Sequence, residues 1–409
     1  MSIFELKREL EDGTYRLTPS APFVLNERGH RRRIAGNHIR DRVVIHCLCD
    51  DVLMPALEPY LIYDNGASRV NMGVSFSRNR LMYHLRSYYS SHGSNDGYIL
   101  LTDFSKYYDN ILHDKALEMV SKHVDNKMAM ALLTAILRNS EVDVSYLSDE
   151  EYSCCYDQKF DSLENMEVDP KLLTGEKMMR KSLNIGDQTS QVLGIFYPTP
   201  IDNYVKIVRG MKYYGRYMDD LYIISDSKEE LQSVLHGIEE VADSLGIFIN
   251  RRKTRIVKLS SPFRYLQIQY RMTESGRIVR KIHPKRVTCT RRKLKKLKAK
   301  LDCGTVSFDD IDGMFRSWMG GCGRDMTRQQ KQNIEALFEN LYSKQRRSKE
   351  DEISHKTSRW YRVEKSRSQW KQLHQYRERD RECIDTRKPY ECHDFGWDCR
   401  RMFREYGAD

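Results

Sequence analysis

Residues 211–225, MKYYGRYMDDLYIIS, place two adjacent carboxylates between two apolar and aromatic runs. Each run has the length and composition of a short β-strand, and the acidic pair, Asp219 and Asp220, falls at the turn between them. Neighbouring side chains on a strand point to opposite faces, so a turn is where both carboxylates can reach one site. Paired carboxylates suit hard divalent cations, which bind oxygen ligands. For this motif alone, a solvated Asp-Asp turn is the alternative.

Another carboxylate, Asp103, follows the apolar run 98–101, where a buried strand is expected to reach the surface. Residues 110–126 then have the apolar spacing of a helix. A strand-end Asp and a hairpin Asp pair suit two Mg²⁺ ions, roughly 4 Å apart, that activate a nucleophilic oxygen and stabilise a leaving phosphate. Mg²⁺ usually takes one or two protein carboxylates beside substrate phosphates, so few ligands suffice. A capping role is the alternative for Asp103.

These motifs, with four further segments, resemble a bacterial reverse transcriptase with a right-hand polymerase core, of the group II intron-like or unknown-group lineage. Residues 103–111 resemble the first catalytic motif of that family, and residues 217–220 match its YxDD motif. The others resemble the opening fingers segment (32–44), the second motif (182–202), the fourth motif (246–254) and the primer grip (263–270). The resemblance covers about 31–342 in the family's order, which is more specific than any single motif.

The resemblance implies roles for the catalytic residues. Asp103, Asp219 and Asp220, with the backbone of Phe104, would hold two Mg²⁺ ions, for which Mn²⁺ is a substitute. Lys253 would protonate or neutralise the departing pyrophosphate; its alternative is a solvated lysine in a basic run.

The resemblance also implies residues on the nucleotide and template side. Tyr108 would form the gate beneath the sugar, where its ring clashes with a ribose 2′-OH. Gly186 would let the backbone approach the base pair, and Gln188 lies beside it. Arg32 and Arg42 would contact triphosphate oxygens through bidentate guanidinium hydrogen bonds. The alternatives are a core aromatic for Tyr108 and a helix-start glycine for Gly186, and which of the five arginines at 31–42 reach phosphate stays open.

Some positions depart from the family's usual residues but leave the three catalytic acids intact. They affect segments expected to handle the template and nucleotide. The departing residues are Asn37, Met72, Asn184, Asp187 and Gln267.

The charge of the chain favours a polyanionic partner. The 409 residues carry a net charge of +11 and a pI near 9.0. Residues 281–300 hold ten Lys or Arg and no acid, and follow the primer grip, where the family places its thumb. A basic helix there would track nucleic-acid phosphates, and a solvated basic helix is the alternative.

The sequence predicts no membrane partner and a cytoplasmic location. It has no run of 18 apolar residues, and its first residues, MSIFELKREL, lack the apolar core of a signal peptide. Its ten cysteines are scattered, which is typical of reduced thiols.

Two segments lie outside the family's motifs. Residues 141–169 hold ten acidic residues and one Lys, which indicates an exposed insertion or loop. Beyond residue 342, we expect a linker at 343–356 and a basic helix at 359–382 that contains Trp360 and Trp370. This helix suits stacking on unpaired bases, or docking on the core or on another copy in a homo-oligomer. Zinc binding at the end of the chain stays open, and its candidate ligands are Cys383, Cys392, His393 and Cys399.

The predicted fold is therefore α+β, a right-hand polymerase with fingers, palm, thumb and a small basic C-terminal extension. Fingers are expected at 1–97, and again, with the insertion, at 125–180. The palm is expected at 98–124 and 181–270, the helical thumb at 271–345, and the basic aromatic extension at 346–409.

The predicted function is RNA-directed DNA synthesis from dNTPs, giving a cDNA product. The expected template is a dedicated structured noncoding RNA in antiphage defence, because no module for DNA integration is recognisable. Three alternatives stay open: the reverse transcriptase of a diversity-generating element, a template-independent terminal transferase, and a non-catalytic RNA-binding scaffold. The template's identity, the type of primer, the fate of the product and the oligomeric state do not follow from the sequence.

Overall fold

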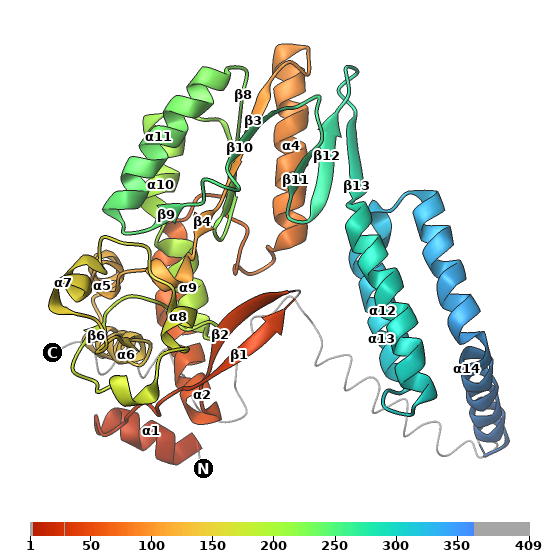
Figure 1. Ribbon diagram of the computed structural model, residues 1–409, viewed down its shortest axis with the longest axis horizontal. Helices are drawn as coiled ribbons and strands as arrows, with labels where there is room; N and C mark the ends of the chain where they lie inside the picture. The colour runs from red at the N-terminus through yellow and green to blue at the C-terminus, as the bar shows by residue number, and fades with distance from the viewer. Residues whose placement is uncertain (1–2, 28, 364–409) are drawn as a thin grey trace. The chain divides into compact units, whose positions relative to one another are not determined.

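The computed structural model describes residues 3–27 and 29–363, with side chains described as far as residue 345 (Figure 1). The chain divides into two compact units. Among the described residues, the first holds the chain through Leu266 and Arg271–Val279, and the second holds Gln267–Tyr270 and residues 280–363.

A four-stranded antiparallel sheet forms the centre of the first unit. Its strands lie in the order β10 (Arg255–Lys258), β3 (Tyr98–Thr102), β8 (Asp220–Ser225) and β7 (Tyr213–Tyr217). The expected strand at 98–101 and the expected hairpin around Asp219 are therefore present. In the register of β3 and β8, Thr102 pairs with Leu221, so Asp103 emerges from the sheet next to Asp220.

Helices cover this sheet because its strands are apolar on both faces. Four of them are α4 (Val74–His92), α9 (Gln188–Phe196), α10 (Thr199–Asn203) and α11 (Lys228–Ser244). Figure 1 shows α11 and α4 on opposite sides of the sheet. Seven of the nine residues of α9 are buried, which makes this helix part of the main core.

The N-terminal part of the same unit carries a β-ribbon beside short helices. The ribbon pairs β1 (Ala21–Glu27) with β2 (His30–Gly36). The helices are α1 (Ile3–Glu11), α2 (Ile39–Leu48), a π-helix (Cys49–Leu53), α3 (Met54–Leu57) and a 3₁₀ helix (Glu58–Tyr60).

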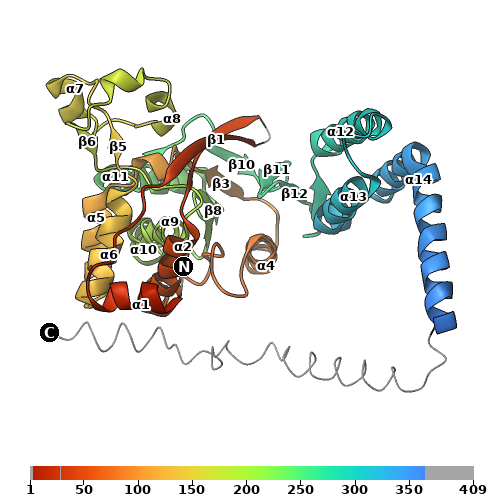
Figure 2. The ribbon, with the colours of Figure 1, turned by 90° about the horizontal axis from the view of Figure 1, so that it is seen from below.

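The expected helix at 110–126 is shorter than its apolar pattern. The chain first forms a 3₁₀ helix, Tyr108–Asn110, and then α5 (His113–Ser121), which lies beside α6 (Lys127–Arg138) (Figure 2). Two short strands, β4 (Phe104–Ser105) and β9 (Phe248–Ile249), pair next to the end of β3.

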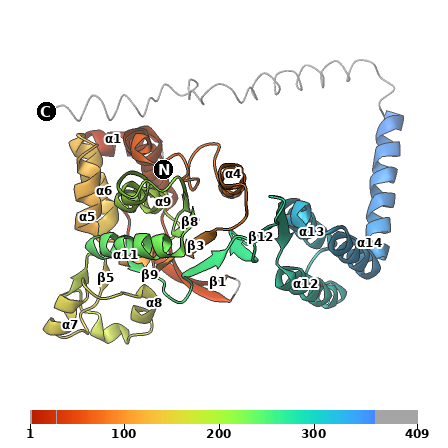
Figure 3. The same cartoon turned by 90° about the horizontal axis from the view of Figure 1, so that it is seen from above.

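The expectation of an exposed loop for the acidic segment is wrong, because this segment folds on a small core of its own. The core contains Val142, Val144, Phe160 and Met179. The elements around it are β5 (Val142–Asp143), α7 (Asp149–Cys154), α8 (Ser162–Asn165), a 3₁₀ helix (Pro170–Leu172) and β6 (Met178–Met179), grouped in Figure 3. These apolar residues are dispersed among acids without helix or strand periodicity, so no sequence pattern revealed the core.

The second unit is mainly helical and has a separate core. Its helices are α12 (Pro284–Asp302), α13 (Phe308–Cys322), a 3₁₀ helix (Gly323–Asp325) and α14 (Arg328–Val363). Leu294, Ile311, Phe315, Phe338 and Tyr342 meet in that core. A three-stranded sheet precedes the helices along the chain, in the order β11 (Phe263–Tyr265), β12 (Ile268–Met272) and β13 (Ile278–Ile282).

The expected linker at 343–356 is also wrong, because α14 continues through it to Val363. The segment is rich in Lys, Arg, Glu and Gln and has no Gly or Pro, so its residues have good helix propensity. Most of the expected helix at 359–382, and the four candidate zinc ligands, lie outside the described residues.

The described elements mix helices with antiparallel sheets, so the predicted α+β class is confirmed. None of the helices that the structure describes is both long and apolar enough to cross a membrane.

Candidate active site

Three carboxylates meet where the central sheet ends. Asp103 follows β3 and is only 4% exposed, and Asp220 begins β8. Tyr217 pairs with Asp220, so Met218 and Asp219 form the turn between β7 and β8. Met218 has a φ of 55°, a left-handed conformation that is uncommon outside glycine. The strand register therefore brings Asp103 to the adjacent pair Asp219 and Asp220, which lies in a distant part of the sequence.

The electrostatics of this cluster disfavour three negative charges. Burial raises the pKa of Asp220 to about 7, and the neighbouring charges of Asp219 and Asp103 add to that effect. Burial also raises the pKa of Asp219, with a contribution from Asp103. Lys253 donates a hydrogen bond to Oδ2 of Asp103 and supplies part of the missing positive charge. Despite the lowering effect of burial, this contact raises the pKa of Lys253.

The donor set fits a divalent cation. Oδ1 of Asp103 is buried and accepts no hydrogen bond from the described residues, so it is an oxygen donor in need of a partner. The two raised carboxyl pKa values indicate a site where added positive charge is favourable. Within the described part of the chain, no group of three or more His, Cys, Asp or Glu side chains, the three acids included, is placed to hold a metal ion by itself. Such a group is not required for Mg²⁺, which also binds substrate phosphates.

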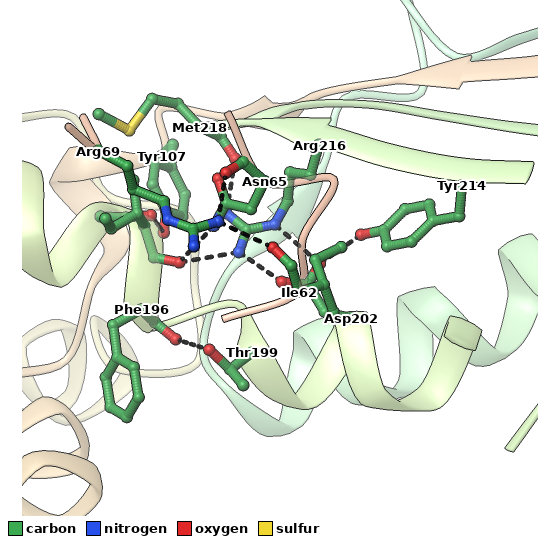
Figure 4. A network of polar contacts seen from close by, with 12 residues as sticks. Ile62, Asn65, Arg69, Tyr107, Phe196, Thr199, Asp202, Tyr214, Arg216 and Met218 are labelled. Atoms are coloured by element: carbon green, nitrogen blue, oxygen red, sulfur yellow. Dashed lines mark hydrogen bonds and ion pairs between the residues drawn. The ribbon is translucent and has the colours of Figure 1, made fainter. Parts of the chain in front are cut away.

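A buried ion pair supports the acidic turn from below (Figure 4). Arg216, the penultimate residue of β7, is fully buried and donates to both carboxylate oxygens of Asp202 on α10, at 2.9 and 2.6 Å. Its Nη1 donates to the carbonyl of Met218 at 3.0 Å, and its Nη2 donates to the carbonyl of Ile195 at 2.8 Å. Tyr214 donates to the same carboxylate. The guanidinium thus connects two helices with the turn that carries Asp219.

Arg216 and Asp202 were not among the residues predicted from the sequence. The available signal was Arg216 itself, a single arginine that follows Tyr213, Tyr214 and Gly215 in the strand before Tyr217. Because the neighbouring residues of this strand are apolar or aromatic, its side chain would be expected in the interior. A buried charge of this kind must be paired, so a buried acid elsewhere in the chain could have been anticipated, although its position could not.

The predicted gate residue lies beside the acidic turn. The hydroxyl of Tyr108 is 3.7 Å from Sδ of Met218, and a Cβ added at Gly194 would approach that hydroxyl to 2.9 Å. Tyr107, in contrast, is buried and donates to the carbonyl of Gly194 at 2.8 Å. Tyr107 is therefore a core residue, and Tyr108 is the partly exposed one of the two.

The predicted fingers residues fall into two groups. The charge of Arg32, on β2, acts on both Asp219 and Tyr108, which places Arg32 close to the acids. Arg42 lies exposed on α2, and its charge is not among the main influences on the pKa of Asp219 or Asp220. Gly186 has a φ of 108°, and an added Cβ would lie 3.3 Å from the carbonyl oxygen of Ala35. In the structure, this glycine allows the loop before α9 to approach β2.

Gln188 and Phe104 are the remaining predicted site residues. Gln188 begins α9 and donates to Asp50 on the π-helix, so its amide points toward that helix. The side chain of Phe104 is buried, and its backbone pairs with Ile249 of β9. Its predicted role as a carbonyl ligand stays a prediction.

Two of the positions that depart from the family's usual residues are in contact. Nδ2 of Asn37 donates to Asp187 at 3.1 Å. Asp187 also caps α9, because its other oxygen accepts from the backbone amide of Thr189 at 2.7 Å. A third departure, Gln267, has a φ of 70°. The carbonyl of the preceding Leu266 accepts from Arg78 of α4, at 2.6 Å from Nη2.

An acidic hairpin turn beside a strand-end carboxylate in an antiparallel sheet defines the class of polymerase-type nucleotidyltransferases. Within that class, residues 71–270 match the protein-family model described as reverse transcriptase (RNA-dependent DNA polymerase). Residues 71–270 are therefore a reverse transcriptase domain.

No curated protein matches the chain. Among solved structures, it is similar to telomerase from Candida albicans in complex with a TWJ fragment of telomeric RNA, with 12% identity and a TM-score of 0.41. It is also similar to apo telomerase from Candida tropicalis, with 12% identity and a TM-score of 0.44. The matches cover 68% and 64% of this chain, which spans less than half of each telomerase chain, 46% and 48%.

Proposed function

We propose that the protein copies RNA into DNA by nucleotidyl transfer, with Asp103, Asp219 and Asp220 as ligands of two Mg²⁺ ions. The observation that carries this proposal is the unpartnered, buried Oδ1 of Asp103 next to two carboxyl groups with raised pKa values. When bound there, two divalent ions activate the primer hydroxyl and stabilise charge on the pyrophosphate.

The chain's own residues orient the reacting groups. Arg32 is the fingers arginine proposed to contact the triphosphate, since its charge acts at Asp219. Tyr108 lies where the ring would contact the sugar of a nucleotide bound beside the turn. Lys253, hydrogen-bonded to Asp103, holds a proton within reach of the acidic cluster and can give it to the departing pyrophosphate.

The proposed template is RNA, held in part by the second unit. Helix α12 carries the basic run 284–300, and most of its Lys and Arg side chains are exposed. Exposed cations spaced along a helix attract phosphates and release counterions when they bind.

We further propose that the template is a dedicated structured noncoding RNA, that the enzyme acts in antiphage defence and that it is cytoplasmic. The net charge of +11 favours a lasting RNA partner. The free cysteines in the described part of the chain favour a reducing compartment.

Primer extension with purified protein tests the enzymatic part. A primed RNA template, dNTPs and Mg²⁺ are expected to give cDNA, and EDTA is expected to stop synthesis. DNA made without template would favour the terminal transferase, and RNA binding without synthesis would favour the scaffold.

Phage challenge tests the biological part. Cells that carry the gene with its native flanks are expected to resist infection, and an Asp219→Ala, Asp220→Ala double variant is expected to be sensitive. Equal protection by the double variant would contradict catalytic defence.

A further inference from the structure

The folded insertion contacts the turn that carries Tyr108. Three consecutive insertion residues, Phe160, Asp161 and Ser162, contact the segment that carries Tyr108. The hydroxyl of Tyr108 itself faces Met218.

The contacts are polar, short and mostly buried. Asn110 and Phe160 form a reciprocal pair, in which the Phe160 amide donates to Oδ1 of Asn110 at 2.8 Å and Nδ2 of Asn110 donates to the Phe160 carbonyl at 3.1 Å. Ser162 donates to Oδ1 of Asp109 at 2.6 Å. Asn110 is fully buried and Ser162 is 4% exposed, so losing either contact would leave a buried polar group unpaired.

The remaining contact, between Asp161 and Lys106, holds a turn in which the backbone of Lys106 is strained. Lys106 has a φ of 50°, which is unfavourable for a residue with a side chain and persists only where surroundings hold it. Its ammonium lies 2.6 Å from Oδ2 of Asp161, whose side chain is 16% exposed. The turn 106–110 is thus held at both ends by the insertion, with Tyr108 between the two.

The insertion also reaches the β-ribbon that carries Arg32. Glu167 pairs with Arg31 of β2 at 2.6 Å, and α8 packs against β2. The insertion therefore contacts both the turn of Tyr108 and the strand of Arg32.

We propose that residues 160–162 of the insertion are positioning residues for Tyr108 and thereby set the preference of the enzyme for deoxyribonucleotides over ribonucleotides. This inference rests on the proposed function, because it assumes that Tyr108 contacts the nucleotide sugar. The physical reason is that a steric gate discriminates only if its ring is held within a fraction of an ångström of the 2′ position.

The test compares variants that release the turn with one that does not. Ser162→Ala and Asp161→Ala each remove one contact to the turn, whereas Asp161→Glu keeps the charge that pairs with Lys106. Asp149→Ala is the matched control, since it breaks the Lys177–Asp149 ion pair of 2.7 Å elsewhere in the same insertion. Melting temperature is measured for every variant, and kcat/KM is measured with dNTP and with rNTP.

The ratio of kcat/KM for dNTP to that for rNTP is expected to fall roughly fivefold or more in Ser162→Ala and Asp161→Ala. It should stay at the wild-type value in Asp149→Ala and largely recover in Asp161→Glu. In a Tyr108→Ala background, Ser162→Ala should cause no further change, because both act through the same ring. An unchanged ratio in both Ser162→Ala and Asp161→Ala, even with a lower melting temperature, would overturn the proposal.

Amide hydrogen exchange separates this inference from the proposed function. If the wild-type protein makes no DNA, the proposed function fails, and the positioning role is then judged on the Asn110 amide, which donates to the Tyr107 carbonyl at 3.1 Å. Faster exchange of that amide in Ser162→Ala than in Asp149→Ala is expected, and equal exchange would contradict a positioning role.

Discussion

The guanidinium of Arg216 binds both carboxylate oxygens of Asp202 in the interior, directly beneath the turn that carries Asp219. Neither side chain is exposed. The same guanidinium holds the carbonyl of Met218, whose left-handed backbone forms the turn. The position of the acidic turn therefore depends on a charge pair that is fully buried.

Removing one member of this pair should destabilise the protein severely. Arg216→Met leaves the Asp202 carboxylate buried without its counter-charge, which is expected to cost about 3–5 kcal/mol of unfolding free energy. Urea denaturation measures the loss. The double variant Arg216→Met, Asp202→Leu should be clearly more stable than Arg216→Met alone, and a double variant no better than the single one would show that the charge is not the cause.

Removing a catalytic carboxylate should abolish synthesis without unfolding the protein. Asp219→Ala and Asp103→Ala are each expected to give no detectable cDNA, while RNA binding and the melting temperature stay close to wild type. In the absence of metal, the neighbouring carboxylates repel one another. Removing one of these negative charges therefore lowers the electrostatic cost of folding. Asp226→Ala, at the opposite end of β8, is the control and should retain activity. Mg²⁺-dependent synthesis by Asp219→Ala would contradict the assignment.

The buried Lys181 predicts an alkaline change in stability. Its Nζ donates to the carbonyls of Cys155, Tyr156 and Gln158, and burial lowers the pKa of Lys181 from 10.5 to about 8. Between these two values the unfolded state binds more protons than the folded state, so this lysine makes stability rise as pH increases from about 8 to 10.5.

The measurement is urea denaturation of wild type and Lys181→Met at pH 7 and pH 10. The difference in unfolding free energy between wild type and variant should shift by roughly 3 kcal/mol in favour of wild type at the higher pH. A pH-independent difference would show that Lys181 has an ordinary pKa.

The positive φ of Gln267 predicts a stabilising substitution. Glycine adopts φ near 70° without a steric penalty, whereas a residue with a Cβ does not. Gln267→Gly is therefore expected to raise the unfolding free energy by about 1 kcal/mol. Gln269→Gly, within β12, serves as the control and should lower it. A destabilising Gln267→Gly would mean that the glutamine side chain makes a contact worth more than the strain.

The contact between Asn37 and Asp187 illustrates what sequence comparison alone overlooks. Taken alone, each of the two residues departs from the usual pattern of the family. The two lie 150 positions apart in the sequence. In the structure, one donates to the other, and Asp187 also caps α9. The two departures therefore form one local arrangement where the fingers meet the second motif.

Local pattern was sufficient for the strands that carry Asp103, Asp219 and Asp220, because apolar runs that end at carboxylates indicate where buried strands reach the surface. Their order and spacing also indicated the reverse transcriptase family, which the match over residues 71–270 supports. The continuous helix α14 and the folded insertion were not anticipated, since a charged helix resembles a linker and a small core lacks periodicity.

By itself, the sequence determined the strands and the turn that carry the three acids, since those follow from short-range alternation and residue chemistry. Only the tertiary structure decided which distant residues meet. The Arg216–Asp202 pair, the Asn37–Asp187 contact and the support of Tyr108 by Ser162 and its neighbours each join segments that chain-local propensity does not relate. Such contacts arise because buried charges and buried polar groups must find partners, and the packing of the whole chain decides which partners lie within reach.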